Sequence, residues 1–148
     1  MSLIELTFVR HGETEKNIQG ILQGRMDVPL NEKGLKEAEE LSDYLKWLKF
    51  DVIFYSDLRR AVQCANKIVK HFPHAEYIKE PLLRERHFGE HQNKKLTDLG
   101  YKNLEYLTMV KHLYECECPN GETNEEVIER IKRFIDACFK SCDNKKIL

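Results

Sequence analysis

Apolar residues along the chain alternate between short continuous runs and stretches in which they recur every three or four positions. Short runs rich in β-branched and aromatic residues are typical of buried strands, and the longer spacing is typical of amphipathic helices. The runs predict strands over 3–9, 52–55 and 75–79, and the start of a strand at Ile147 and Leu148. The spacing predicts helices over 31–49, 58–71 and 124–139. Alternating strands and helices favour a layered α/β sheet.

Each predicted helix has one apolar face, which we expect to pack on the sheet. The three faces contain Leu35, Ala38, Leu41, Tyr44, Leu45 and Leu48; then Ala61, Ala65, Ile68 and Phe72; then Val127, Ile131, Phe134, Ile135 and Cys138. The first strand adds Leu3, Ile4, Leu6, Phe8 and Val9 to the expected core. The middle of the chain, 81–119, is less regular, and its predicted helix covers 94–114.

The 148 residues fit one domain spanning 1–148, without an internal repeat or a low-complexity linker. The predicted architecture is three-layer α/β/α with a mainly parallel central sheet. The last residues of the chain leave two interpretations open. Either Ile147 and Leu148 pack at the surface of the sheet, or a further strand is missing after them.

Composition narrows the classes of partner. The chain has 24 basic and 25 acidic residues and a net charge of -1, which gives no electrostatic footprint for nucleic acid or an anionic membrane. No apolar stretch approaches the roughly 20 residues that span a bilayer. The N-terminus lacks the pattern of a signal peptide, so we expect a cytoplasmic protein.

The five cysteines are an odd number, and we expect them to be reduced thiols. They are Cys64, Cys116, Cys118, Cys138 and Cys142. Cys116 and Cys118, or Cys138 and Cys142, raise the question of a zinc site. The spacing is not that of a zinc knuckle, and the second pair lies on a predicted helix, so the sequence favours no metal.

Basic side chains follow two predicted strands. Arg10 and His11 end the first strand, and Arg59 and Arg60 begin the helix after the second. Ligands of open α/β sheets bind at the carboxyl ends of strands, and arginine pairs well with phosphate oxygens. The pattern indicates a histidine that attacks phosphorus. An arginine–histidine pair after a strand is more often a surface or capping feature, so the pattern alone leaves both interpretations open.

Five ordered blocks resemble the histidine phosphatase (phosphoglycerate mutase-like) superfamily. The first is Arg10-His11-Gly12-Glu13-Thr14-x-x-Asn17, which is similar to the family signature RHG(E/Q)(T/S)xxN. The others are Gln23-Gly24 with Asp27, Pro29-Leu30 and Gly34; Phe50-Asp51 with Ser56-Asp57-Leu58-x-Arg60-Ala61-x-Gln63; 83–89; and 119–123. They cover nearly the whole chain.

The resemblance implies a covalent mechanism without a cofactor. His11 would be the nucleophile and Glu85 the acid and base, while Arg10 and Arg60 would hold the phosphoryl oxygens. The resemblance places the remaining substrate-binding positions at Gly12, Thr14, Asn17, Gln23, Gly24, Arg86, His87 and Phe88. Glu85 lies between Arg84 and Arg86, so a surface ion pair is its alternative role.

A second motif competes for the middle of the chain. The run from His87 to His91 fits H-x-x-E-H, a metalloprotease pattern. That motif needs a sound helix to align both imidazoles, and Gly89 lies at its centre. The sequence therefore disfavours a protease.

The chain departs from the family pattern at its end. The resemblance implies a second phosphate-binding histidine on a late strand, and His71, His74, His87, His91 and His112 all lie upstream. The final strand and helix of the fold are expected to be missing as well, so we interpret the chain as truncated. A partner chain that supplies the strand, in a homodimer, is one way to complete it.

The expected function is hydrolysis of a small phosphomonoester, of the sugar phosphate or phosphoglycerate type, through phospho-His11. One alternative is a cofactor-dependent phosphoglycerate mutase. The other is a non-catalytic phosphate-binding module that lacks the second histidine.

Overall fold

The computed structural model describes residues 4–100, 111, 115–142 and 144–148. A four-stranded sheet with the order β1-β4-β2-β3 lies at its centre, and all neighbouring strands are parallel. The strands are β1 (Glu5–Leu6), β2 (Val52–Tyr55), β3 (Glu76–Lys79) and β4 (Lys146–Ile147). The mainly parallel α/β sheet predicted from the sequence is therefore confirmed.

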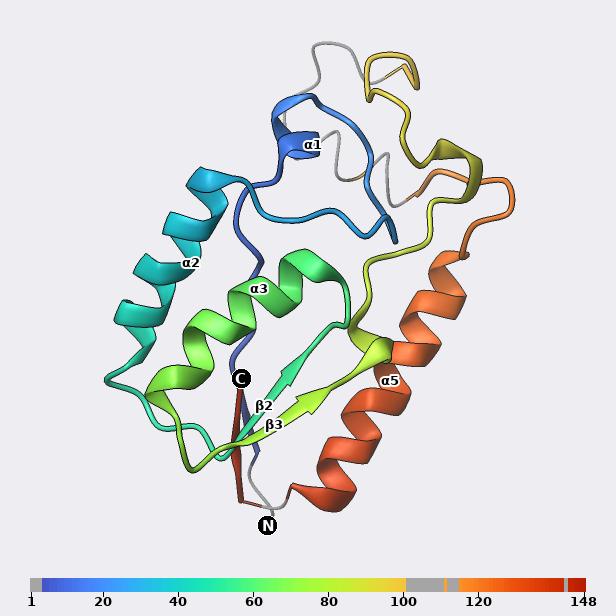
Figure 1. Ribbon diagram of the computed structural model, residues 1–148. Helices are drawn as coiled ribbons and strands as arrows, with labels where there is room; N and C mark the ends of the chain where they lie inside the picture. The colour runs from blue at the N-terminus through green and yellow to red at the C-terminus, as the bar shows by residue number, and fades with distance from the viewer. Residues whose placement is uncertain (1–3, 101–110, 112–114, 143) are drawn as a thin grey trace.

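Helices cover both faces of the sheet. Helices α2 (Glu32–Leu45) and α3 (Arg59–Ile68) lie together on one side, and α5 (Asn124–Ser141) lies on the other (Figure 1). Side chains of a strand point alternately to the two faces. Ile53 and Leu148 accordingly join the core under α2 and α3, whereas Val52 and Ile147 join the core under α5. The three layers follow from this alternation.

Polar caps set the starts of the helices. The Asn31 side chain accepts from the backbone N–H of Gly34 at 2.8 Å, and Thr123 forms a capping box with Glu126 at the start of α5. Such caps satisfy N–H groups that have no partner within the helix. A second capping box, between Thr14 and Asn17, begins the short helix α1 (Glu15–Ile18).

The predicted strands and long helices are confirmed, with shifted ends. β2 has the predicted bounds, and 58–71 forms α3 followed by a 3-10 turn. The predicted helix over 94–114 begins in turns and a bridge up to Gly100, so those residues are not helical, and its remainder lies mostly outside the described residues.

Several predicted core positions are wrong. Phe8 and Val9 are 73% and 40% exposed, because β1 pairs with β4 and β4 ends at Ile147, beside Leu6. Tyr44 and Leu48 are also exposed, because α2 packs on α3 through Ala38 and Leu45 and then ends. On α5, Val127, Ile131 and Ile135 are only half-buried. Periodicity identifies a face but not how much of it a neighbouring element covers.

The described part of the chain holds no helix long and apolar enough to cross a membrane. All five cysteines are free thiols, as predicted.

Candidate active site

His11 lies just after the first strand, and two hydrogen bonds define its protonation. Its Nδ1 lies 2.7 Å from the Gly12 carbonyl oxygen, and its Nε2 lies 3.1 Å from Arg60 Nε. A guanidinium nitrogen can only donate, so Nε2 is the acceptor and Nδ1 carries the proton. Burial lowers the pKa of His11, and the nearby Arg60 and Arg10 lower it further. The hydrogen bond to the Gly12 carbonyl and the charge of Glu85 act in the opposite direction and raise it, but by less. The unprotonated Nε2 is therefore a nitrogen that can act as a nucleophile.

Arg60 is a buried cation without a hydrogen-bonded carboxylate among the described residues. Its side chain donates Nη1 to the Met26 carbonyl and Nη2 to the Gly24 carbonyl, both at 2.8 Å, and Nε to His11. Only 2% of the residue is exposed. Burial lowers the pKa of Arg60, an effect that Glu85 and Asp27 partly oppose from a distance. A buried charge is unfavourable unless it is paired, so this position favours an anion.

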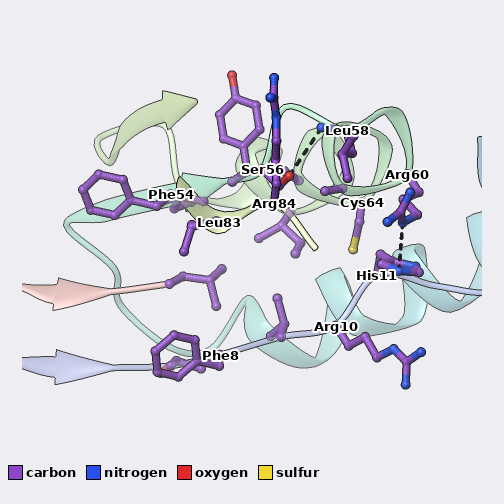
Figure 2. Close-up of a pocket in the computed structure, with 18 of the residues that line it drawn as sticks. Phe8, Arg10, His11, Phe54, Ser56, Leu58, Arg60, Cys64, Leu83 and Arg84 are labelled. Carbon is purple, nitrogen blue, oxygen red and sulfur yellow. Dashed lines mark hydrogen bonds between the residues drawn. The ribbon is translucent and has the colours of Figure 1, made fainter. Parts of the chain in front are cut away.

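A cavity of about 550 Å³ opens beside these two side chains. One end is polar and basic, with Arg10, His11, Arg60, Arg84 and Glu85 in its wall. The rest is apolar. Figure 2 shows the His11 ring facing Arg60, while the Arg10 side chain extends away from both. Among the described residues of this wall, His11 is the only histidine. Two arginine-bearing loops thus converge at one crevice, as the sequence predicts.

Glu85 reaches the same cavity from the loop after β3. The residue is exposed, and its Oε1 accepts from the backbone N–H of Arg86 at 2.9 Å. Its charge acts on both His11 and Arg60. Arg84 is the neighbour that forms the ion pair, with Asp57, at 2.7 Å between Nε and Oδ1. Glu85 therefore remains available to a ligand in the cavity.

Close backbone packing positions the histidine loop. A Cβ atom on Gly12 would lie 2.4 Å from the Gly34 carbonyl oxygen, and one on Gly34 would lie 2.0 Å from the Glu13 carbonyl oxygen. Glycine is needed at both positions because only a residue without a side chain allows this approach. The loop is thereby held against the start of α2.

Thr14, Asn17 and Gln23 form a polar cluster behind the histidine loop. Thr14 is fully buried, and its Oγ1 lies 2.8 Å from Asn17 Oδ1 and 2.9 Å from Gln23 Oε1. Gly24 holds Arg60 through its carbonyl oxygen. In the described structure these residues contact other protein groups, and their predicted role in substrate binding stays a prediction.

Arg86, His87 and Phe88 lie outside the wall of the cavity. Arg86 is buried, donates to the carbonyls of Cys116 and Glu122, and stacks over the Phe88 ring at 5.6 Å. The His87 ring accepts from the Gly89 N–H at 3.2 Å. Gly89–His91 is a short 3-10 helix, so the H-x-x-E-H run does not form the helix that a metalloprotease motif needs, in agreement with the sequence analysis.

The sequence prediction missed an ion cluster beside the site. Glu122 accepts from Arg130 Nε at 3.0 Å and from Arg25 Nη2 at 2.5 Å, and its Oε2 accepts from the backbone N–H of His87. The sequence analysis gives Glu122 no role beyond its place in the family block 119–123. Nothing in the spacing of residues 25, 122 and 130 indicates that they meet.

Comparisons with known proteins agree with this fold and site. The model of the histidine phosphatase superfamily (branch 1) matches residues 6–148. The chain therefore belongs to the histidine phosphatase superfamily. It is 37% identical to fructose-2,6-bisphosphatase TIGAR B of Danio rerio, over 95% of this chain but only 55% of that protein's length.

Two further relatives are similar over almost the whole chain. Identity to adenosylcobalamin/alpha-ribazole phosphatase of Salmonella typhimurium is 32%, covering 98% of this chain and 73% of the relative. The crystal structure of a phosphoglycerate mutase from Bacillus anthracis superposes with a TM-score of 0.77 at 25% identity, covering 98% of this chain and 72% of that one.

Proposed function

We propose that the chain hydrolyses a small phosphomonoester through a phosphohistidine at His11. The observation that carries this proposal is the pair formed by Arg60 and His11. A buried cation with no hydrogen-bonded carboxylate in the described structure lies 3.1 Å from an imidazole nitrogen that carries a lone pair. A phosphoryl group would satisfy both, because its oxygens take the arginine donors while phosphorus faces the nitrogen.

The reaction would proceed in two displacements. Nε2 of His11 forms a bond to phosphorus as the bond to the leaving oxygen breaks, and protonated Glu85 gives that oxygen its proton. The Glu85 carboxylate then takes a proton from water, whose oxygen attacks phosphorus and breaks the P–N bond. Arg60 stabilises the charge on the transferring group in both steps, because it is already fixed by two carbonyls. Arg10 would act at the mouth of the cavity.

The substrate class follows from the relatives. The two matched phosphatases are named for fructose 2,6-bisphosphate and for alpha-ribazole compounds, so a phosphorylated sugar or sugar-like metabolite is the proposed substrate. The apolar part of the cavity gives room for more than a phosphate group. Location in the cytoplasm, assembly as a homodimer and completion of the domain by further chain stay proposals. The free thiols support the first of these.

A first experiment compares p-nitrophenyl phosphate hydrolysis by the protein, by His11→Ala and by His74→Ala. His74 is an exposed histidine outside the cavity wall, so its variant controls for the loss of a histidine as such. We expect His11→Ala to lower kcat/KM at least about 10⁴-fold and His74→Ala to change it less than about twofold. Unchanged turnover in His11→Ala would contradict the covalent mechanism.

The alternatives are distinguished with natural substrates. The similarity to a phosphoglycerate mutase makes mutase activity the second candidate. Incubation with 3-phosphoglycerate would then give 2-phosphoglycerate without free phosphate. A non-catalytic module would bind inorganic phosphate, lose that binding in Arg60→Gln and turn over neither compound.

A further inference from the structure

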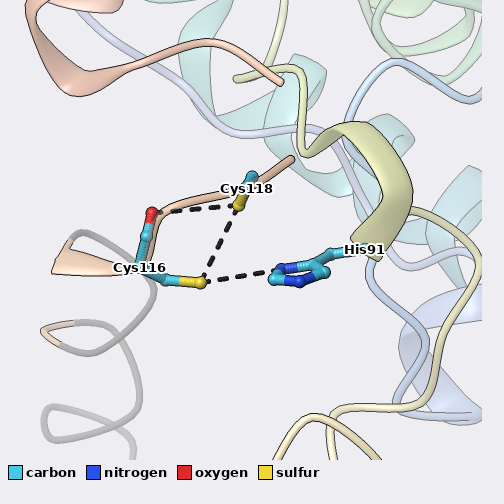
Figure 3. A group of neighbouring side chains, drawn as sticks. All are labelled: His91, Cys116 and Cys118. Carbon is cyan, nitrogen blue, oxygen red and sulfur yellow. Dashed lines mark hydrogen bonds between the residues drawn. The ribbon is translucent and has the colours of Figure 1, made fainter. Parts of the chain in front are cut away.

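Three metal-binding side chains meet outside the cavity, on the far side of the Arg86 loop. His91 ends the 3-10 helix Gly89–His91, and Cys116 and Cys118 lie in the extended segment before α5 (Figure 3). The Cys116 sulfur lies 3.6 Å from His91 Nδ1 and 3.9 Å from the Cys118 sulfur. All three ligand atoms lie within 4.8 Å of one another. In the described part of the chain, no other three histidine, cysteine or acidic side chains converge in this way.

Two of the three distances between the ligand atoms fit one shared ion. Tetrahedral zinc binds sulfur at about 2.3 Å and imidazole nitrogen at about 2.05 Å. Two sulfurs on such an ion lie about 3.8 Å apart, and a sulfur and a nitrogen about 3.6 Å apart. The observed 3.9 Å and 3.6 Å agree with both values. The third pair, the Cys118 sulfur and the His91 ring nitrogen, lies within 4.8 Å, so an ion can enter if these two side chains close by at most about 1.2 Å.

Backbone contacts hold the two segments together independently of any ion. The Glu90 N–H donates to the Pro119 carbonyl at 2.9 Å, and the Asn120 side chain donates to Glu90 at 2.8 Å. A Cβ atom on Gly89 would lie 1.9 Å from the Pro119 oxygen, so the two chains approach as closely as backbones can. The ligands are consequently arranged in advance, which reduces the ordering that binding requires.

We propose that His91 Nδ1, Cys116 Sγ and Cys118 Sγ bind one zinc ion, with water as the fourth ligand. Two thiolates and an imidazole are soft or borderline ligands, which suit zinc rather than magnesium or calcium. The two thiols release their protons to solvent on binding, so two thiolate charges balance the ion. All three residues are half-buried, which leaves the ion a route from solvent.

The proposed ion is a structural clamp and not part of the catalytic centre. None of its ligands lines the cavity beside His11. The Cys116 carbonyl accepts from Arg86 Nη2 at 2.8 Å, and Arg86 follows Glu85 directly. Fastening 116–118 to the turn that contains His91 thereby supports the loop that presents Glu85. The zinc site does not depend on the proposed phosphatase activity.

The test uses cobalt as a spectroscopic replacement for zinc. The full chain, metal-free and kept reduced with a phosphine, is titrated with Co²⁺ while absorption is recorded. We expect one equivalent to give a thiolate-to-cobalt charge-transfer band and the visible bands of tetrahedral cobalt, and added Zn²⁺ to remove both. Each of Cys116→Ser, Cys118→Ser and His91→Ala is expected to weaken binding at least tenfold. Cys142→Ser, which alters a buried thiol outside the cluster, is expected to bind as the unaltered protein does.

Three results would overturn the proposal. The first is that the reduced protein gives no charge-transfer band with Co²⁺. That result would stand even if Cys116 and Cys118 form a disulfide when the protein is left in air. The second is full cobalt binding by the double variant of Cys116 and Cys118, which would place the metal elsewhere. The third is loss of the band in Cys142→Ser while its circular dichroism spectrum shows an intact fold.

Discussion

Two buried arginines, Arg60 and Arg130, lie in similar surroundings but have different partners. Arg60 is 2% exposed and Arg130 is 6% exposed, and both donate to backbone carbonyls. Arg130 also donates Nε to Glu122 at 3.0 Å and Nη2 to the same carboxylate at 3.3 Å. Arg60 has no such carboxylate in the described structure and instead donates Nε to His11.

The difference separates a structural cation from a binding cation. Glu122 neutralises Arg130 within the fold, so we expect the pair to contribute to stability. Because the two charges cancel, they exert little electrostatic attraction on a ligand. Arg60 has no hydrogen-bonded carboxylate among the described residues, only the more distant charges of Glu85 and Asp27, and an anion in the cavity would stabilise it. Protein function is thus expected to depend on Arg60, and protein stability on Arg130.

Within this comparison of the two arginines, the largest expected effect is the loss of catalysis in Arg60→Gln. Glutamine keeps hydrogen-bonding capacity but removes the charge that would stabilise the transferring phosphoryl group. We expect kcat/KM for p-nitrophenyl phosphate to fall about 10²–10³-fold, with the midpoint of thermal unfolding unchanged or raised. Arg59→Gln is the matched control, because the neighbouring Arg59 is exposed and its side chain forms an ion pair with Asp27 at the surface. A large loss of stability in Arg60→Gln, with kcat/KM retained, would show that Arg60 is the structural cation and would contradict its proposed role in binding.

The second effect is on stability and comes from Glu122→Gln. This change leaves Arg130 buried beside a neutral group and also removes the ion pair with Arg25. We expect the free energy of unfolding in urea to fall by about 3 kcal/mol, while kcat/KM changes little in the folded fraction. Glu129→Gln, an exposed position on α5 next to Arg130, should change the unfolding free energy by less than about 0.5 kcal/mol. Equal effects of the two substitutions would mean that the cluster does not stabilise the fold.

Much of the fold could be predicted because it follows from local patterns. The four residues of β2, the start of α5 after Thr123 and the helix after Leu58 all depend on neighbours in the sequence. Exposure could not be predicted in the same way. Phe8 and Tyr44 have the same periodicity as core residues, and only the packing of other elements decides whether they are covered.

The candidate site likewise has residues that the sequence could indicate and contacts that only the folded structure reveals. The position after a strand makes Arg10, His11 and Arg60 candidates but leaves a surface role open, and only the family resemblance gives them and Glu85 a predicted role. The contact of His11 with Arg60 joins residues 49 positions apart and needs the sheet order to be known. The closeness of Cys116 and Cys118 is visible in the sequence, but nothing local indicates that His91 joins them. Such contacts come from loops that the sheet brings together.

The smallest expected effect is on the titration of His11, and it tests whether Arg60 acts through its charge. Burial lowers the pKa of His11 below its ordinary 6.5, and Arg60 and Arg10 contribute in the same direction. Below pH 6.5 the unfolded chain therefore binds more protons at this histidine than the folded protein does. This group's contribution to stability is accordingly complete above 6.5 and is lost as the pH falls from there through the folded pKa.

An imidazole NMR titration measures this pKa directly in the folded protein and in Arg60→Gln. We expect the His11 midpoint below 6.5 in the unaltered protein and a shift upward in the variant, because one neighbouring cation is gone while burial remains. Arg59→Gln again serves as the control and should leave the midpoint where it is. A midpoint at or above 6.5 would show that His11 is not held in its neutral form. An unmoved midpoint in Arg60→Gln would show that the Arg60 charge is compensated after all, and the contrast with Arg130 would then fail.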